Sequence, residues 1–289
     1  MARDLDLTEE LTTHILRNAS IQNYVPTGGN LILAIQSPPG EGKTYHCKVV
    51  LGELGVALVR FPIADLESPG AGLPAVRLIE KYIQASSLIE KGMPAVLMIE
   101  DADLGIGNSS IQGEITQFTM NRGLITGTLM SLCDSPTLVE VPSESALTVR
   151  GSGRLCKRVP IIMTGNNLRG IYPALFRDGR ARVIDWRASE NTKVEYLQGR
   201  IPGARYDSVA LLVKEFYEFP ISSWESILEL VQSSAIRDAV RAMVSRDDIP
   251  TLASMVERAS NLSPRQLSLE DVRVEAGRHR VLRNEWSVR

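Results

Sequence analysis

Residues 37–44 read SPPGEGKT and have the spacing of a phosphate-binding loop. The segment matches the pattern G-x-x-x-x-G-K-[ST] except at its first position, which is serine. In such a loop, backbone N–H groups face the phosphates, the lysine adds a positive charge, and the last hydroxyl binds Mg²⁺. Because an apolar run precedes the segment and a helical pattern follows it, we expect a nucleoside triphosphate site. The predicted ATP contacts are Pro38, Pro39, Gly40, Glu41, Gly42, Lys43 and Thr44, and Thr44 is also a predicted ligand of Mg²⁺.

Acidic residues follow a second apolar run, AVLMI at residues 95–99. A nucleotide-hydrolysing site needs one acid near Mg²⁺ and one acid that orients the attacking water. Glu100 and Asp101 are therefore predicted to be catalytic and to lie at the metal, although acids at a strand end can also be merely solvated. The usual order is Asp then Glu, and here it is reversed, so the sequence leaves the division of roles open. Asp103 is a third candidate for the water.

Amide and guanidinium side chains follow later segments of the chain. Asn166 and Asn167 come after the apolar run at residues 159–163, where an amide can bond the attacking water or the γ-phosphate. Asparagine also favours turns for reasons of its own backbone. Arg177 and Arg180 precede the last expected strand, where they can reach a phosphate across a subunit interface, although most surface arginines are simply solvated. We predict that Asn166, Arg177 and Arg180 are catalytic.

Strands and helices alternate along the first two thirds of the chain and must position these residues. Short apolar runs predict strands at residues 30–36, 56–61, 95–99, 159–163 and 183–186. Helical patterns occupy residues 44–54, 74–89 and 114–132. Such alternation predicts an α/β fold with a mostly parallel sheet and helices on both faces.

Beyond residue 188 the strand patterns stop, and helical stretches follow at residues 192–197, 208–217, 223–231 and 251–259. A short helix and a linker precede the first strand. We therefore expect an N-terminal helix and linker at residues 1–29, a large α/β subdomain at 30–187 and a small helical subdomain at 188–289.

The composition excludes several classes of protein. Hydrophobic residues make up 44% and charged residues 23% of the chain, which is ordinary for a globular protein. The formal net charge of -2 removes the broad electrostatic argument for a nucleic-acid partner. The N-terminus lacks the apolar stretch of a secretory signal, and the chain has no apolar run of about 18 residues. The three cysteines fit no metal or disulfide pattern. We expect a cytoplasmic protein without a membrane partner.

Taken together, these residues resemble the rubisco activase family of AAA+ ATPases, from about residue 30 to residue 288. The specific stretches are residues 64–75, 114–121 with 128–130, 159–166 and 177–180. The resemblance implies a P-loop NTPase fold of AAA+ type, with a parallel-sheet large subdomain followed by a small all-helical subdomain. It also implies that ATP and Mg²⁺ are bound and that a homo-oligomeric ring, a hexamer, uses hydrolysis to remodel rubisco.

The same resemblance implies roles for single positions. Asn166 is similar to the sensor-1 asparagine of the family, and Arg177 and Arg180 are similar to its arginine fingers. Residues 66–72 are similar to the first pore loop, and the stretch around Phe118 is similar to the second.

The chain departs from the family at three places. Residues 1–29 are too short for the usual N-terminal domain, no regulatory cysteine tail follows Arg289, and residues 231–233 read Val-Gln-Ser where an arginine is expected. Either Arg237 replaces that arginine or the sensor-2 role is absent. The remodelled protein is therefore rubisco or another target. An alternative is a nucleotide-switched binding module with little turnover, and a nucleic-acid motor is disfavoured by the acidic balance.

Overall fold

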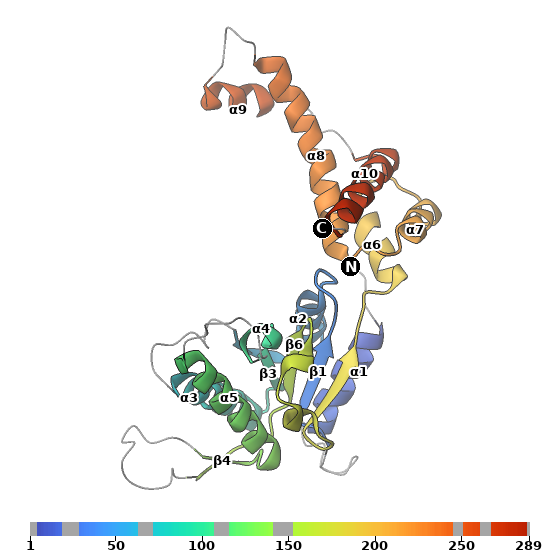
Figure 1. Ribbon diagram of the computed structural model, residues 1–289. Helices are drawn as coiled ribbons and strands as arrows, with labels where there is room; N and C mark the ends of the chain where they lie inside the picture. The colour runs from blue at the N-terminus through green and yellow to red at the C-terminus, as the bar shows by residue number, and fades with distance from the viewer. Residues whose placement is uncertain are drawn as a thin grey trace. The chain divides into compact units, whose positions relative to one another are not determined.

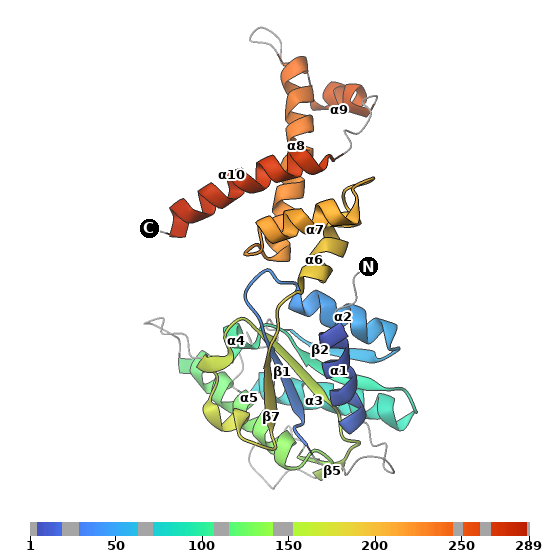
Figure 2. The same cartoon turned by 90° about the vertical axis from the view of Figure 1, so that its right-hand side faces the viewer.

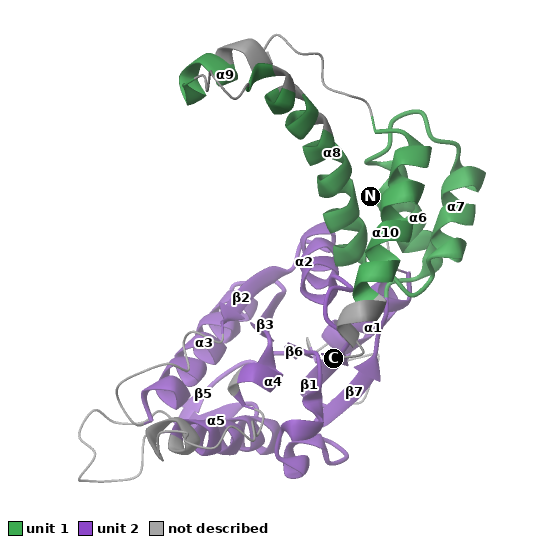
Figure 3. Cartoon of the chain, turned by 45° about the horizontal axis from the view of Figure 1, so that its top comes forward, with its two compact units in different colours: residues 1–3, 188–289 green, residues 4–187 purple. Residues whose placement is uncertain are grey.

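The computed structural model describes residues 5–18, 29–62, 72–106, 116–140, 153–244, 251–260 and 267–287. The chain forms two compact units, shown in separate colours in Figure 3. We call residues 4–187 the sheet unit and residues 188–289 the helical unit. The expected first pore loop lies outside the described residues except for Gly72, as does the side chain of Phe118.

A five-stranded parallel sheet forms the centre of the sheet unit (Figure 1). Its order is β2-β3-β6-β1-β7. The strands are β1 (Ile32–Gln36), β2 (Ala57–Phe61), β3 (Ala95–Ile99), β6 (Ile161–Gly165) and β7 (Ala181–Asp185). Every residue of β3 and β6 is buried, so both faces of the sheet are covered there, as expected for parallel strands between helices. The predicted parallel α/β sheet is confirmed.

Four long helices and three short ones surround this sheet in the described part of the chain. The long ones are α1 (Leu5–Asn18), α2 (Lys43–Glu53), α3 (Leu73–Glu90) and α5 (Thr116–Asp134), and the short ones are α4 (Ala102–Gly105), η2 (Leu168–Gly170) and η3 (Pro173–Phe176). Helix α1 packs beside α2 (Figure 2), and α3 packs beside α5. Helix α3 begins after Gly72, which has a φ of 83°, and its buried Leu78 and Tyr82 join the core under the sheet.

Helix α1 belongs to the sheet unit, although it precedes the expected boundary at residue 29. Its side chains Leu7, Leu11 and Ile15 are buried. A polar contact adds to this packing, because His14 Nε2 lies 3.1 Å from the carbonyl oxygen of Ile161. The helix therefore forms part of the packed body of the sheet unit.

A short antiparallel hairpin between α5 and β6 was not predicted. It consists of β4 (Leu138–Glu140) and β5 (Gly153–Leu155), with Leu138 opposite Leu155. Each strand has three residues, and β5 is exposed throughout. Segments this short and solvated carry no hydrophobic periodicity that would reveal them in the sequence.

The helical unit contains α6 (Glu190–Gln198), α7 (Tyr206–Glu215), α8 (Ile221–Met243), α9 (Leu252–Ser260) and α10 (Leu269–Ser287). Its core is built around Phe216, Phe219 and Trp224, whose rings contact one another. Helix α10 was not predicted because it is rich in charged residues, and among its few buried residues are Val272 and Ala276. The predicted order, a parallel-sheet part followed by helices, is confirmed. In the described part of the chain, no helix is long and apolar enough to cross a membrane.

Candidate active site

Three neighbouring strands bring the predicted residues to one edge of the sheet. Strand β6 lies between β3 and β1, and all three run parallel. Residues 37–44 follow β1, the acids follow β3, and Asn166 follows β6. Because the carboxyl ends of parallel strands meet at the same edge, the three segments converge where ligands usually bind in such folds.

The loop after β1 has the backbone geometry that its glycines predict. Gly40 and Gly42 have φ values of 84° and 81°, a region that glycine adopts without steric cost. Gly42 is also the N-cap of α2, so the loop ends at a helix N-terminus whose N–H groups favour anions. Ser37 is outside the positive-φ region, which explains why the usual glycine is not required there.

Lys43 and Asn166 are joined directly. The Lys43 ammonium donates a hydrogen bond of 2.6 Å to Asn166 Oδ1. Lys43 is only 7% exposed, and a buried charge needs such a partner. The contact places the end of the lysine beside the turn after β6. The structure therefore brings together these two residues, which the sequence predicted from separate segments.

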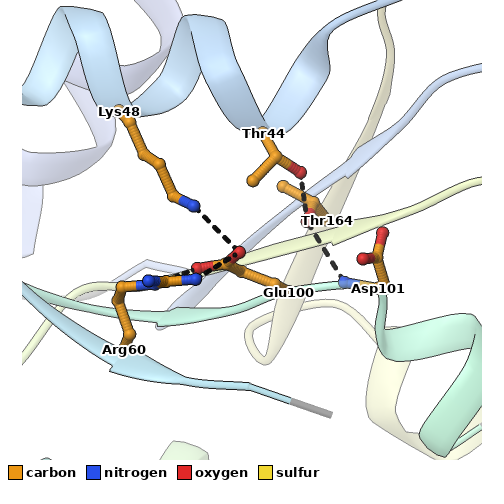
Figure 4. A network of polar contacts seen from close by, with 6 residues as sticks. All are labelled: Thr44, Lys48, Arg60, Glu100, Asp101 and Thr164. Carbon is orange, nitrogen blue, oxygen red and sulfur yellow. Dashed lines mark hydrogen bonds and ion pairs between the residues drawn. The ribbon is translucent and has the colours of Figure 1, made fainter. Parts of the chain in front are cut away.

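Asp101 lies beside Thr44 and Thr164 (Figure 4). The Asp101 N–H donates to Thr164 Oγ1 at 3.4 Å, and that oxygen lies 3.5 Å from Thr44 Oγ1. Asp101 has a φ of 50°, and it is the one non-glycine residue with positive φ in the described part of the chain. Such strained backbone is concentrated at functional sites. Sequence reasoning missed Thr164, whose only signal is a hydroxyl within an otherwise apolar strand.

Glu100 faces away from Thr44, toward two cations (Figure 4). Arg60 of β2 binds it through two bonds, Nε to Oε1 at 2.5 Å and Nη2 to Oε2 at 3.0 Å. Lys48 of α2 donates a third bond of 3.0 Å to Oε2. Burial alone would raise the pKa of Glu100, but the bonds from Arg60 and Lys48 lower it below its ordinary value. No sequence pattern indicated these cations, and the metal role of Glu100 stays a prediction.

Asp103 is bonded to the turn that carries Asn166. Its Oδ2 accepts the N–H groups of Asn166 at 2.9 Å and of Asn167 at 3.1 Å. The third acid of the segment is therefore engaged with backbone.

The two predicted arginine fingers differ in their surroundings. The guanidinium of Arg180 binds both carboxylate oxygens of Asp134, at 2.9 and 2.7 Å, and also the carbonyl of Ala174 at 3.0 Å. Arg177 is exposed, and its guanidinium has no hydrogen bond or ion pair with any described residue. Arg180 is thus held within its own chain, whereas the side chain of Arg177 is exposed.

These residues fit a magnesium nucleotide. The loop supplies left-handed glycines, a helix N-terminus, a lysine and a threonine hydroxyl, which together suit phosphate oxygens and a bound cation. No group of three or more His, Cys, Asp or Glu residues could hold a metal ion in the described part of the chain. Mg²⁺ in nucleotide sites is usually held by one or two protein ligands together with water and phosphates, so Thr44 and a nearby acid would be enough.

Comparisons with known proteins agree with this geometry. The family model for the ATPase family associated with various cellular activities (AAA) matches residues 33–186. The ribulose bisphosphate carboxylase/oxygenase activase of Anabaena sp. is 34% identical over 235 residues, covering 80% of this chain and 54% of the relative. The chloroplastic activase of Zea mays is 32% identical over 249 residues, covering 85% and 54%. The chain spans about half the length of the curated relatives it matches. With the family model covering over half of the chain, and the loop, acids and Asn166 at one sheet edge, the chain belongs to the AAA family of ATPases.

Proposed function

We propose that this protein is an ATP-hydrolysing motor that assembles as a homo-oligomeric ring, a hexamer, and remodels a protein partner. The observation that carries the proposal is the convergence of three segments at one sheet edge. There Lys43 bonds Asn166 at 2.6 Å, and the Asp101 carboxylate lies on the side of Thr44. This combination supports hydrolysis as well as binding.

Each residue has a definite task in this proposal. The loop N–H groups and Lys43 bind the phosphates, and Thr44 is a ligand of Mg²⁺. Mg²⁺ held by Thr44 would supply positive charge that offsets the negative charge of the phosphates. Asp101 accepts a hydrogen bond from the attacking water and orients it toward the γ-phosphate. Asn166 donates an amide N–H to the γ-phosphate or to that water.

A neighbouring subunit completes the site. Arg177, exposed and unpaired within the described chain, enters the site of the next copy and stabilises transition-state charge. Arg180 lies in the same turn, where its N–H donates to the carbonyl of Arg177. Because its guanidinium binds Asp134, we assign Arg180 the task of holding this turn in place.

The partner is a protein, either rubisco or another target. Support comes from the relatives, which are named as activases of ribulose bisphosphate carboxylase/oxygenase. Because these relatives are only about one third identical, the target is a proposal of its own. The direct test is to add this protein and ATP to purified, inhibited rubisco and to measure whether rubisco activity returns. We propose that the protein acts without a nucleic-acid or membrane partner. We also propose that it is located in the cytoplasm.

A second candidate is a nucleotide-switched binding module with little turnover. It is favoured by one observation, the engagement of both Glu100 oxygens by Arg60 and Lys48, which competes with a metal role. Steady-state phosphate release separates the two candidates. The motor hydrolyses ATP, and Lys43→Ala abolishes turnover, whereas the exposed-lysine control Lys91→Ala keeps it. Tight ATP binding with no phosphate release from the wild-type chain would favour the module.

A further inference from the structure

The carboxylate of Asp103 is enclosed by the turn that follows β6. Its Oδ2 accepts two backbone N–H groups, from Asn166 at 2.9 Å and from Asn167 at 3.1 Å. Its Oδ1 is buried and has no hydrogen-bond partner among the described residues. One oxygen of this carboxylate already accepts two hydrogen bonds and the other is buried, so neither is accessible to an attacking water. Asp103 is therefore poorly placed for the water-orienting role that its position in the sequence suggested.

Gly165 makes this close approach possible. A Cβ atom at that position would lie 2.9 Å from Asp103 Oδ1 and 2.4 Å from Leu168 Cδ2. Contacts under about 3 Å are not tolerated in a close-packed interior, so a side chain at residue 165 would push the carboxylate off the turn. The strand thus ends in the residue type that lets Asp103 reach the next two N–H groups.

The same turn is held from the other side by β1. Gln36 Oε1 accepts the N–H of Leu168 at 2.9 Å, while Asp103 accepts the N–H of Asn166. Asn166 in turn presents its Oδ1 to Lys43 at 2.6 Å. A continuous set of hydrogen bonds therefore runs from the acidic segment through the backbone of Asn166 to the lysine of the phosphate loop.

We propose that Asp103 is a positioning residue that acts through Asn166. Its carboxylate fixes the backbone of Asn166 and Asn167, so that the Asn166 amide faces Lys43 and the phosphates. Hydrogen bonds from N–H groups to an ionised carboxylate are stronger than neutral ones, which suits this anchoring task. The proposal rests on the proposed function, because it assigns Asp103 a place within that site.

The first test compares Asp103→Ala with wild type. Displacing a catalytic group by about 1 Å can cost on the order of 100-fold in rate, so we expect kcat for ATP hydrolysis to fall by about 10- to 100-fold. The affinity for ADP should stay within about twofold, since the loop that holds the remaining phosphates is unchanged. Asp103→Asn, which keeps one acceptor oxygen, should recover part of the lost rate. Asp207→Ala removes an exposed acid of α7 and serves as the control.

A double-mutant cycle with Asn166→Ala distinguishes positioning from direct catalysis. If Asp103 acts through Asn166, the double variant Asp103→Ala/Asn166→Ala hydrolyses ATP no more slowly than Asn166→Ala alone. If the two losses multiply, Asp103 acts independently and the proposal is overturned. Equal melting temperatures of the single variants and the Asp207→Ala control exclude a general loss of folding as the cause.

A binding measurement keeps the proposal separate from the hydrolysis claim. The ratio of affinities for a non-hydrolysable ATP analogue and for ADP reports contacts to the γ-phosphate. We expect Asp103→Ala and Asn166→Ala to lower this ratio equally. A wild-type chain that binds both nucleotides without turnover would overturn the proposed function but leave this comparison readable. An Asp103→Ala variant with the wild-type ratio, beside an Asn166→Ala variant that has lost it, would overturn the positioning role.

Discussion

Two arginines three positions apart show that residue type alone does not reveal whether a side chain is already bound within its own chain. The sequence places Arg177 and Arg180 together before a strand, yet Asp134 and the carbonyl of Ala174 occupy the guanidinium of Arg180. Asp134 lies at the end of α5, far along the chain from either arginine. Motif residues such as Lys43 and Asn166 were predictable because their chemistry fixes type and spacing. The residues that contact Asp101, Glu100 and Arg180 were not predictable, because only the tertiary fold brings them near. They are Thr164, Lys48, Arg60 and Asp134.

The arginines should therefore respond differently to truncation. We expect Arg177→Ala to lower kcat on the order of 1,000-fold, the range seen for arginines that stabilise phosphoryl-transfer transition states, without changing the melting temperature. Arg180→Ala should lower the melting temperature as well, because it leaves Asp134 and Ala174 without their partner. Phosphate release and thermal melting of both variants test this. Equal melting temperatures for the two variants would contradict the distinction.

The neighbouring acids Glu100 and Asp101 should also divide their labour. Successive residues at a strand end point in different directions, and only the Asp101 carboxylate lies on the side of Thr44. We expect Asp101→Asn to bind ATP normally and to lose about 100-fold or more in turnover, as for removal of a general base. A metal role for Glu100 requires its carboxylate to leave Arg60 and Lys48 when Mg²⁺ and ATP bind. On that hypothesis, Glu100→Gln weakens Mg²⁺-dependent ATP binding.

Arg60→Ala is the matched control for Glu100. It removes the main cation from the Glu100 carboxylate but leaves the acid available to Mg²⁺. Nucleotide affinities measured with and without Mg²⁺ should then show a loss in Glu100→Gln that Arg60→Ala lacks. Matching losses in the two variants would assign Glu100 to the ion-pair network alone. A wild-type rate in Asp101→Asn would move the water-orienting role to another acid.

Secondary-structure elements were predictable where one pattern decides them. The run at residues 95–99 is buried throughout, and the predicted strand has the same bounds as β3. Strand β6 is different, because it covers Ile161–Gly165 whereas the apolar run ended at residue 163. Pairing of Thr164 with Ile35 and of Gly165 with Gln36 extends the strand past its apolar residues. Tertiary pairing thus overrides local composition at the point where the site begins.

Helix α1 supplies a prediction at the scale of an element. His14 is buried, and burial lowers its pKa from 6.5 to about 4. Nε2 faces the carbonyl of Ile161 and so carries the proton of the neutral ring. The unfolded chain binds a proton at His14 below about pH 6.5, while the folded chain does not until about pH 4. Stability should therefore fall as the pH drops through this window, by up to about 1.4 kcal/mol per pH unit, and should be unaffected by His14 above it.

Thermal unfolding at pH 7.0 and at pH 5.0 measures this effect. His14→Gln removes the titrating ring but keeps a donor for Ile161, so its melting temperature should change less between the two pH values than that of wild type. Subtracting the pH-dependent change in melting temperature of His14→Gln from that of wild type cancels the contribution of the other histidines. An identical pH dependence in both chains would show that α1 does not hold His14 neutral.

At the scale of the whole molecule, the proposed ring would complete each site with a residue from the neighbouring subunit. Lys43 and Asp101 lie at the carboxyl edge of the sheet, whereas Arg177 follows η3 and finds no partner among the described residues of its own chain. A guanidinium that acts across an interface makes each active site the product of two copies. Variants defective in different parts of the site can then complement each other, provided that they assemble together.

Mixing inactive Lys43→Ala subunits with inactive Arg177→Ala subunits tests this sharing. In a mixed ring, some interfaces join an intact loop on one copy to an intact Arg177 on the next, so ATP hydrolysis should recover. Random assembly makes about one interface in four fully intact, so recovery should approach a quarter of the wild-type rate if sites act independently. A mixture of Lys43→Ala with Asp101→Asn is the control, because both defects lie in the same half of the site and should give no recovery beyond the residual rate of Asp101→Asn. Affinity tags would show that the two kinds of subunit assemble together. If neither mixture then recovers ATP hydrolysis, Arg177 does not act in the site of a neighbouring subunit.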